Sequence, residues 1–311
     1  NYSHGPVEWD SGRRIMEAQS GMDERFLLLY SDNFVPFPLK KVLLHHERHG
    51  LPLTFMASPK SPGNIAIDEL GIVRMYDNQR TAELPFVEIG YMVVERDLLL
   101  KHFPHPDCSF SEVLRCMAAK HQIGAWIQKD AYHSISDQER WKITECYLQP
   151  KKIVLLDRDG VINEKAPSGE YINYWQDFHW VNQTRESMRR LAQLGFRFIV
   201  ISNQAGIARG KTSAEEVERI HKNMAKILLS EGIEILQVYV CPHHWEEGCD
   251  CRKPKPGMLL QASKDHLFRL DRSLFVGDDP RDLEAAEQAG CKGLLFDGQI
   301  DLATEILQIE V

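Results

Sequence analysis

Ile153-Val-Leu-Leu-Asp-Arg-Asp-Gly160 is a short apolar run that ends in two carboxylates and a glycine. A wholly apolar run of this length predicts a strand buried on both faces. Further apolar runs recur through the second half of the chain, separated by helical patterns. They span Phe196–Ser202, Ile235–Val240, Leu274–Val276 and Gly293–Phe296. The alternation predicts an α/β fold, a Rossmann-like parallel sheet with helices on both faces.

The helices between these strands carry start and stop signals. Ser213 and Glu216 have the spacing of a capping box, and an apolar stripe follows at helical period. Pro256 and Pro280 suit the first turns of two later helices, and Gly290 suits the end of the last. Ligands of such sheets bind beyond the carboxyl ends of the strands, so the polar residues there become the candidate site.

The composition is that of a folded protein large enough for two domains. The chain has 311 residues, 43% of them hydrophobic and 26% charged, with a net charge of −8. The negative charge argues against a nucleic-acid partner, whose phosphates attract basic faces. No apolar run approaches the ~20 residues that a membrane span needs, so we expect no membrane partner.

Cysteine usage and the first residues bear on location. The seven cysteines are an odd number with three crowded together, unlike a secreted disulfide framework, so a reducing cytoplasm is expected. The first residues, Asn1 to Pro6, have neither the basic nor the apolar region of a signal peptide. The sequence begins without Met, which suggests a processed or truncated N-terminus.

The first half forms a separate unit, and we expect domains at 1–150 and 151–311. The join is placed near Gln149-Pro-Lys-Lys152, just before the strand that carries Asp157. The expected helix of the first domain is Lys40–His49. Its expected strands are Arg25–Tyr30, Leu53–Ala57, Ile65–Ile67, Val73–Tyr76 and Val87–Val94.

Asp157 and Asp159 suit a division of labour in phosphate chemistry. One carboxylate attacks phosphorus while Mg²⁺ holds it together with the phosphoryl oxygens. The other protonates the leaving oxygen, which matters because an alkoxide is a poor leaving group. Taken alone, the pair is explained equally well as a solvated acidic turn.

Polar residues after the other strands change that balance. Asp278 follows Leu274–Val276 and offers a second carboxylate for a hard cation shared with Asp157. Ser202 and Asn203 supply a hydroxyl and an amide for a phosphoryl oxygen. Arg252 and Lys253 supply positive charge for the phosphate and the nearby carboxylates. The ordered set indicates a phosphatase site.

A second motif predicts a zinc ion. Cys241, His243, Cys249 and Cys251 offer three thiolates and an imidazole, a tetrahedral ligand set with no open position, so the zinc is expected to be structural. Packed reduced cysteines and a disulfide are the alternatives, and His244 competes with His243. The expected task of the zinc is to hold the loop that delivers Arg252 and Lys253.

These motifs resemble the haloacid dehalogenase superfamily of phosphatases over about residues 152–299. The resemblance implies that Asp157 becomes an aspartyl-phosphate, and that Asp159 acts as acid and then as base. It also implies that Asp159 lends its backbone carbonyl to Mg²⁺, which Asp278 binds as well. Ser202 and Asn203 would bind phosphate, and Lys253 would orient nucleophile and phosphate.

Three longer motifs resemble the D-glycero-D-manno-heptose 1,7-bisphosphate 7-phosphatases. They are Asp157-Arg-Asp-Gly-Val-Ile-Asn163, Ser202-Asn-Gln-Ala-Gly-Ile-Ala-Arg-Gly210 and Cys251-Arg-Lys-Pro-Lys-Pro-Gly-Met258. The resemblance implies a phosphorylated sugar substrate, a place in nucleotide-activated heptose biosynthesis, and a substrate-phosphate role for Arg252.

Two departures from this family put the exact sugar in doubt. Ser202 stands where the family usually has Thr, and Asp279 stands where it usually has Lys, which removes a cation near the substrate. Histidinol-phosphate phosphatases share much of the pattern and are the nearest alternative. A binding or scaffolding subunit with an inert phosphatase fold is the non-enzyme alternative.

The first half resembles, through fewer residues, the sugar-1-phosphate nucleotidyltransferases. Phe26–Asn33 is similar to their strand with a metal-binding Asp, here Asp32, and Glu88–Val94 is similar to their sugar-side segment. Ser134 stands where their second metal Asp belongs, and their Gly-rich nucleotide loop is not in this sequence. We therefore expect an incomplete domain, truncated or degenerate, through which oligomers form. If residues precede this sequence, a bifunctional enzyme is the alternative.

Overall fold

The computed structural model describes residues 4–129, 132–167 and 169–309. It contains two compact units, Asn1–Trp141 and Lys142–Val311. The join predicted near Gln149 falls later than this division, which lies inside α5 (Gln138–Leu148). The end of α5 belongs with the second unit, where the Lys151 ammonium lies 3.5 Å from the Cys146 sulfur.

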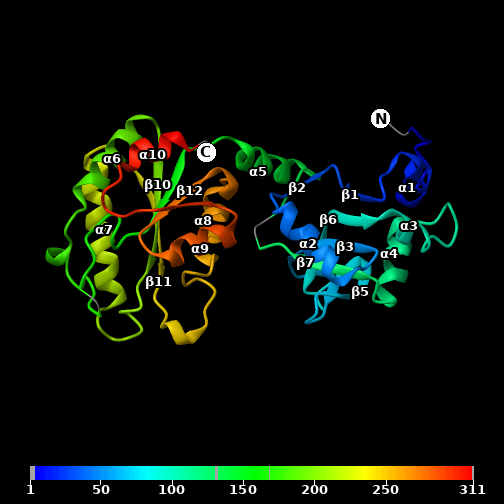
Figure 1. Cartoon of the computed structure of the whole chain (residues 1–311), viewed down its shortest axis with the longest axis horizontal. Helices are drawn as coiled ribbons and strands as arrows, with labels where there is room; N and C mark the ends of the chain where they lie inside the picture. Colours follow the sequence, from blue (N-terminus) through cyan, green and yellow to red (C-terminus); the bar gives the residue numbers. More distant parts are fainter. Residues whose placement is uncertain (1–3, 130–131, 168, 310–311) are drawn as a thin grey trace. The chain divides into compact units, whose positions relative to one another are not determined.

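The second unit is built on a parallel sheet in the order β11-β10-β9-β12-β13. Its central strand is β9, the apolar run that the sequence motif opens with (Figure 1). The strands are β9 (Ile153–Leu156), β10 (Arg197–Asn203), β11 (Ile235–Cys241), β12 (Leu274–Gly277) and β13 (Lys292–Leu295). The predicted sheet is confirmed, with each predicted strand found within about two residues.

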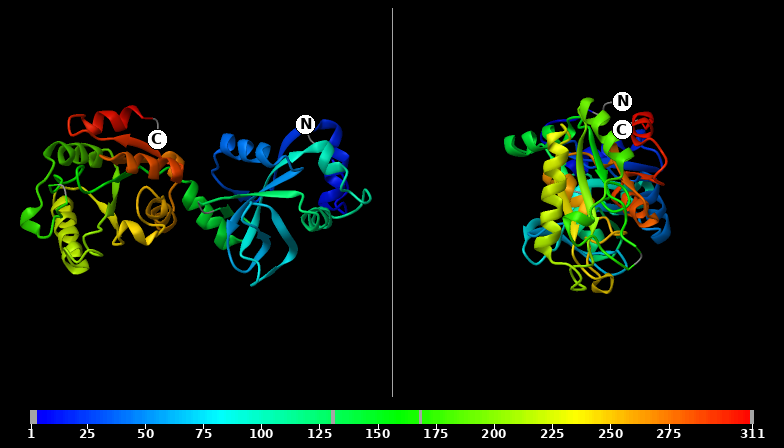
Figure 2. Two further views of the ribbon diagram at one scale, coloured as in Figure 1. Left: turned by 60° about the horizontal axis from the view of Figure 1, so that its bottom comes forward. Right: turned by 90° about the vertical axis from the view of Figure 1, so that its left-hand side faces the viewer.

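Two hydrophobic cores cover the two faces of this sheet, because successive side chains of a strand point to opposite sides. Val154 and Leu156 pack with one group of helices, and Ile153 and Leu155 with the other. The first group comprises α6 (Asn182–Gln193), α7 (Ala214–Ser230) and α10 (Leu302–Gln308). The second comprises α8 (Gly257–His266) and α9 (Pro280–Ala289). Figure 2 shows the helices flanking the strands.

The predicted helix ends are largely confirmed. Ser213 accepts the backbone N–H of Glu216 at 3.1 Å and so caps α7. Pro280 is the first residue of α9, and Gly290 ends that helix with φ +74°, a conformation that favours glycine. Pro256 lies just before α8 as its N-cap. Short 3₁₀ turns lie at η2 (Trp175–Asp177), η3 (Trp245–Glu247) and η4 (Leu270–Arg272).

The first unit contains a mixed sheet in the order β5-β4-β6-β3-β7, with β1 paired to β6. The strands β3 and β7 run parallel, whereas the other pairings are antiparallel. The strands are β1 (Arg25–Leu29), β3 (Leu53–Pro59), β4 (Gly63–Ile67), β5 (Val73–Thr81), β6 (Phe86–Glu95) and β7 (Ile123–Ile127). All of the strands predicted for this half are present, and β7 was not predicted.

Helices cover both faces of the mixed sheet, and η1 (Gln19–Gly21) follows the first of them. The helices are α1 (Ser11–Ala18), α2 (Leu39–His49), α3 (Arg96–Leu100) and α4 (Phe110–Ala119). Only α2 was predicted. A small separate sheet pairs β2 (Asn33–Phe34) with β8 (His133–Ser134).

None of the helices among residues 4–129, 132–167 and 169–309 is both long enough and apolar enough to span a membrane.

The sheet of the second unit predicts a stability difference between two leucines. Leu155 is fully buried in β9, whereas Leu229 of α7 is 64% exposed. Leu155→Ala is expected to destabilise the second unit by about 2–5 kcal/mol, because it leaves a cavity between the sheet and its helices. Leu229→Ala should change stability by less than about 0.5 kcal/mol. Urea unfolding measures both, and equal midpoints for the two variants would contradict this assignment of the core.

Candidate active site

The carboxyl ends of β9, β10 and β12 bring the predicted catalytic residues to one edge of the sheet. Asp157 follows β9, Ser202 lies at the end of β10, and Asp278 follows β12. Because β9 is hydrogen-bonded to both β10 and β12, residues more than 100 positions apart in sequence become neighbours. This is the edge at which parallel sheets bind their ligands.

A buried ammonium group joins the predicted nucleophile to an acidic residue that sequence reasoning missed. The Lys253 Nζ lies 2.8 Å from Asp157 Oδ1 and 2.8 Å from Asp282 Oδ1, and donates to the Ile201 carbonyl at 3.0 Å. Lys253 is only 3% exposed and Asp282 2%. Burial lowers the pKa of Lys253, but the charges of the two carboxylates raise it more, so the ammonium stays protonated.

Asp282 carried a sequence signal that was not used. It lies three residues after Asp279, and the two form a capping box at the start of α9. The Asp279 N–H donates to Asp282 Oδ2 at 3.1 Å, which leaves Asp282 Oδ1 for Lys253. A capping spacing directly after a metal-binding candidate therefore pointed to a third acidic residue at the site.

Asp157, Asp278 and Asp282 form an oxygen-rich cluster that fits a hard cation. One carboxylate oxygen from each lies within 4.8 Å of the others. Asp278 Oδ1 is buried without a hydrogen-bond partner among the described residues, while Oδ2 is 2.5 Å from the Lys165 ammonium. Gly160 lies so close that a Cβ there would come 2.0 Å from Asp278 Oδ2. The glycine of the motif is thus needed for this close approach.

The surroundings of Asp157 set its protonation. Burial raises its pKa, the charge of Lys253 lowers it, and the charge of Asp282 raises it again, with a net increase. A divalent cation at the carboxylate cluster would favour the ionised form that a nucleophile requires. The site therefore holds Asp157 in a setting where its charge depends on nearby cations.

Asp159 is held by three side chains rather than by the carboxylate cluster. Arg158 Nη2 donates to both of its carboxylate oxygens at 2.8 Å. Asn163 donates to Oδ1 at 3.0 Å, and Gln204 donates to Oδ2 at 2.8 Å. Burial raises the pKa of Asp159, but the charge of Arg158 and these hydrogen bonds outweigh burial and lower it.

The residues predicted to bind phosphate lie at the same edge of the sheet. They differ in burial and in how far hydrogen bonds within the protein already engage their side chains. Ser202 is fully buried, and its hydroxyl accepts from Gln204 at 2.8 Å. The Asn203 side chain exchanges two hydrogen bonds of 3.1 Å with the backbone of Lys253. The amide of Asn203 is therefore engaged in fixing the Lys253 loop to β10. Arg252 is partly exposed, and its Nη1 lies 3.5 Å from the His243 carbonyl.

Asp279, which replaces an expected lysine, has a structural task. Its carboxylate accepts the backbone N–H of Arg281 at 3.0 Å and so caps α9. The Arg281 guanidinium also donates to this carboxylate, at 2.8 Å, and this contact lowers the pKa of Asp279. Lys165 and Arg281 thus both place positive charge near Asp278 and Asp279.

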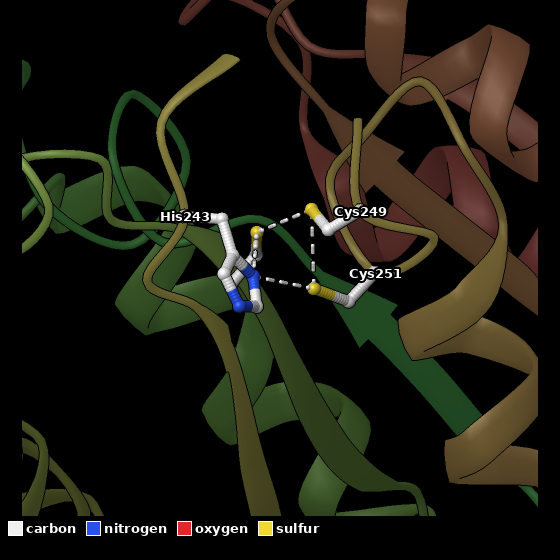
Figure 3. A group of neighbouring side chains, drawn as sticks. His243, Cys249 and Cys251 are labelled. Atoms are coloured by element: carbon white, nitrogen blue, oxygen red, sulfur yellow. Dashed lines mark hydrogen bonds between the residues drawn. The ribbon is translucent and has the colours of Figure 1, made fainter. Parts of the chain in front are cut away.

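The predicted zinc ligands converge at the end of β11, which holds Cys241, and in the loop that follows it. Figure 3 shows His243, Cys249 and Cys251 pointing toward one another. His243 Nδ1 lies 3.6 Å from the Cys241 sulfur and 3.2 Å from that of Cys251. The Cys249 sulfur is 3.7 Å from that of Cys241 and 3.5 Å from that of Cys251. In a tetrahedral zinc site, sulfur ligands lie about 3.8 Å apart and a sulfur lies about 3.6 Å from a nitrogen. The four separations agree with these values to within about 0.4 Å, so the four side chains fit a zinc ion.

His244, the competing histidine, is not part of this group of four. Its Nδ1 accepts from the Glu246 N–H at 3.4 Å, and its ring lies 3.7 Å from that of Trp245. The choice of His243 over His244 agrees with the geometry.

In the first unit, the segment that ends in Asp32 and Asn33 lies beside Ser134, the position where the resembled family has its second metal Asp. Asn33 pairs with Ser134, and the Ile135 N–H donates to the Asp32 carbonyl at 2.9 Å. Glu88 of β6 is part-buried and accepts the Gly90 N–H. Burial raises the pKa of Glu88 to about 7.

Comparison with known proteins finds phosphatases similar to the second unit. A family model described as polynucleotide kinase 3 phosphatase matches residues 152–289. The D-glycero-beta-D-manno-heptose-1,7-bisphosphate 7-phosphatase of Pseudomonas aeruginosa is 39% identical over 145 residues, covering 47% of this chain and 80% of that protein. The histidine biosynthesis bifunctional protein HisB of Campylobacter jejuni is 34% identical over 146 residues, covering 47% of this chain and 42% of that protein.

Among solved structures, a D,D-heptose 1,7-bisphosphate phosphatase from B. bronchiseptica, complexed with magnesium and phosphate, is 32% identical with a TM-score of 0.45. It matches 50% of this chain and 86% of that one. With 39% identity to a relative that it covers by four fifths, the chain belongs, through its second unit, to the heptose-bisphosphate phosphatases of the haloacid dehalogenase superfamily, a family of phosphoric monoester hydrolases.

Proposed function

We propose that the second unit hydrolyses the 7-phosphate of D-glycero-D-manno-heptose 1,7-bisphosphate, in the synthesis of nucleotide-activated heptose. The observation that carries the proposal is Asp157 at the strand edge, 2.8 Å from the buried Lys253 ammonium and clustered with Asp278 and Asp282. A carboxylate oxygen beside a fixed cation and two further acidic groups suits in-line attack on a phosphate monoester. The names of its relatives support the sugar.

In the proposed mechanism, an Asp157 oxygen forms a bond to phosphorus while the bond from phosphorus to the sugar oxygen breaks. Asp159 is ionised in the free site and takes up a proton when the negatively charged phosphate binds beside it, since a nearby negative charge raises the pKa of a carboxyl. It gives that proton to the departing alkoxide and then takes one from the water that attacks the aspartyl-phosphate. Phosphate leaves and Asp157 is regenerated. A magnesium ion held by Asp157, Asp278 and the Asp159 carbonyl would supply charge neutralisation for the phosphoryl oxygens.

Lys253, Ser202, Asn203 and Arg252 complete the proposed substrate site. Lys253 orients the Asp157 carboxylate. Ser202, at the end of β10, is the proposed hydroxyl ligand of the phosphate. Asn203 contributes by holding the backbone of Lys253, with which it makes two hydrogen bonds of 3.1 Å. Arg252 lies in the same loop and carries several guanidinium donors, which suit a substrate phosphate.

Histidinol-phosphate hydrolysis is the second candidate, favoured by the similarity to a histidine biosynthesis protein. Phosphate release from both compounds, measured with Mg²⁺ and the pure chain, separates the two. We expect a higher kcat/KM for the heptose bisphosphate, with one phosphate released per molecule. A clear preference for histidinol phosphate would assign the second candidate instead.

Removing the nucleophile should abolish turnover. For Asp157→Asn we expect kcat to fall by about 10³-fold or more, because the amide cannot form the acyl-phosphate bond. Asp107→Asn is a matched control outside the second unit, since the Asp107 side chain is 78% exposed. Magnesium-dependent turnover that persists in a folded Asp157 variant would mean that another group attacks phosphorus.

We propose that Cys241, His243, Cys249 and Cys251 hold one structural zinc ion per chain. Metal analysis of native protein should find it, and Cys249→Ser should lower the zinc content. Because the same loop carries Lys253, zinc loss is expected to weaken the binding of inorganic phosphate clearly, while the second unit stays folded. Cys116→Ser, at an exposed cysteine outside the cluster, is the control. Native protein free of zinc would exclude the proposal.

For the first unit we propose a nucleotidyltransferase-like fold without transfer activity. The juxtaposition of Asp32 and Ser134 supports the fold. The serine supports the loss of chemistry, because a neutral hydroxyl attracts a divalent cation less strongly than the carboxylate that the family has at this position. Cytoplasmic location and the absence of nucleic-acid and membrane partners are part of the same proposal.

A further inference from the structure

Arg158 is buried beside the active site, although its place in the Asp-Arg-Asp-Gly motif suggests a spacer. Its side chain is 1% exposed. One edge of the guanidinium donates to Asp159, through Nε at 3.1 Å and Nη2 at 2.8 Å. A guanidinium is planar and donates in fixed directions, so its orientation determines the orientation of the carboxylate that it holds.

The opposite edge of the guanidinium meets His221 of α7. Arg158 Nη1 lies 3.0 Å from His221 Nε2, and His221 is 6% exposed. Arginine has only donors, so this contact requires Nε2 to be an acceptor and hence a neutral ring with its proton on Nδ1. Burial and the adjacent guanidinium lower the pKa of His221 to about 3, which agrees with a neutral ring.

We propose that His221 is a positioning residue, which orients the carboxylate of Asp159, the proposed proton carrier, through Arg158. The inference rests on the proposed phosphatase mechanism and extends it. His221, on α7, contacts one edge of the Arg158 guanidinium and so fixes the orientation of its plane. The opposite edge of the guanidinium then fixes the orientation of the Asp159 carboxylate. Gln204 and Asn163 each contact one oxygen of the same carboxylate, whereas Arg158 contacts both.

This arrangement gives His221 an effect that depends on the leaving group. A sugar alkoxide needs a proton as it departs, whereas a nitrophenolate leaves without one. Loss of the His221 acceptor leaves Nη1 a buried donor without that partner and frees the guanidinium to turn. A misplaced Asp159 then slows alkyl phosphates selectively. The comparison uses kcat/KM, which reports steps through departure of the leaving group.

The test compares two substrates of the whole chain with Mg²⁺. The sugar phosphate is D-glycero-D-manno-heptose 1,7-bisphosphate, and the other substrate is 4-nitrophenyl phosphate. For His221→Leu we expect kcat/KM on the sugar phosphate to fall by about 10- to 100-fold, with kcat carrying most of the loss, because general acid catalysis contributes 10²–10⁴-fold. The fall on 4-nitrophenyl phosphate should be under about 3-fold. Both rates come from one sample, so a reduced folded fraction cancels in their ratio.

Two further variants complete the experiment. His221→Gln offers an acceptor to Arg158 and should restore most of the selectivity. Met224→Leu changes a buried residue one turn along α7, and both substrates should respond to it alike. Equal losses on both substrates for His221→Leu, or no rescue by Gln, would reduce His221 to a packing role. A wild-type chain that hydrolyses neither substrate would instead overturn the proposed function.

Discussion

The ammonium of Lys253 between Asp157 and Asp282 is the interaction on which the rest of the site depends. Three charged groups lie together and buried at the carboxyl end of β9. Burying a charge is unfavourable unless it is paired, so each group depends on the others. The third acceptor, the Ile201 carbonyl, fixes the ammonium to β10. Asp157, from β9, and Asp282, from α9, can approach each other only because this cation separates them.

The elements around the site hold that cation in place. Asn203 binds the backbone of Lys253 from the end of β10, and the cysteine and histidine cluster closes the loop just before it. On the opposite side, Asp279 caps α9 and presents Asp282. Asp159 lies outside this charge pair, in a separate group with Arg158 and Gln204. The proposed nucleophile and the proposed acid therefore have different electrostatic surroundings, although only Arg158 separates them in the chain.

Much of the second unit could be predicted because its strands are mostly apolar and its helices have clear caps. The polar residues after those strands had to meet at one sheet edge, so Asp157, Ser202 and Asp278 were found as a group. The first unit was harder. The strand β7 is as long as β1 and β4, which were predicted, but Gly124 at its second position interrupts its apolar run. The helices α1 and α4 lie outside the segments for which helical periodicity was predicted. A Cβ at Gly124 would lie 2.2 Å from the His49 ring. Such a close approach between distant segments cannot be predicted from the local sequence pattern.

The sequence by itself determined the kind of chemistry, because residue type and strand position decide which donors and charges reach the sheet edge. It also indicated the four side chains of the proposed zinc site, which lie within eleven residues. Only the tertiary structure decided how these groups divide the work. Asp282 faces Lys253 because α9 packs on the sheet, and His221 meets Arg158 because α7 crosses the other face, 63 residues away in the chain. Such partners depend on the packing of one element against another, which local periodicity does not specify.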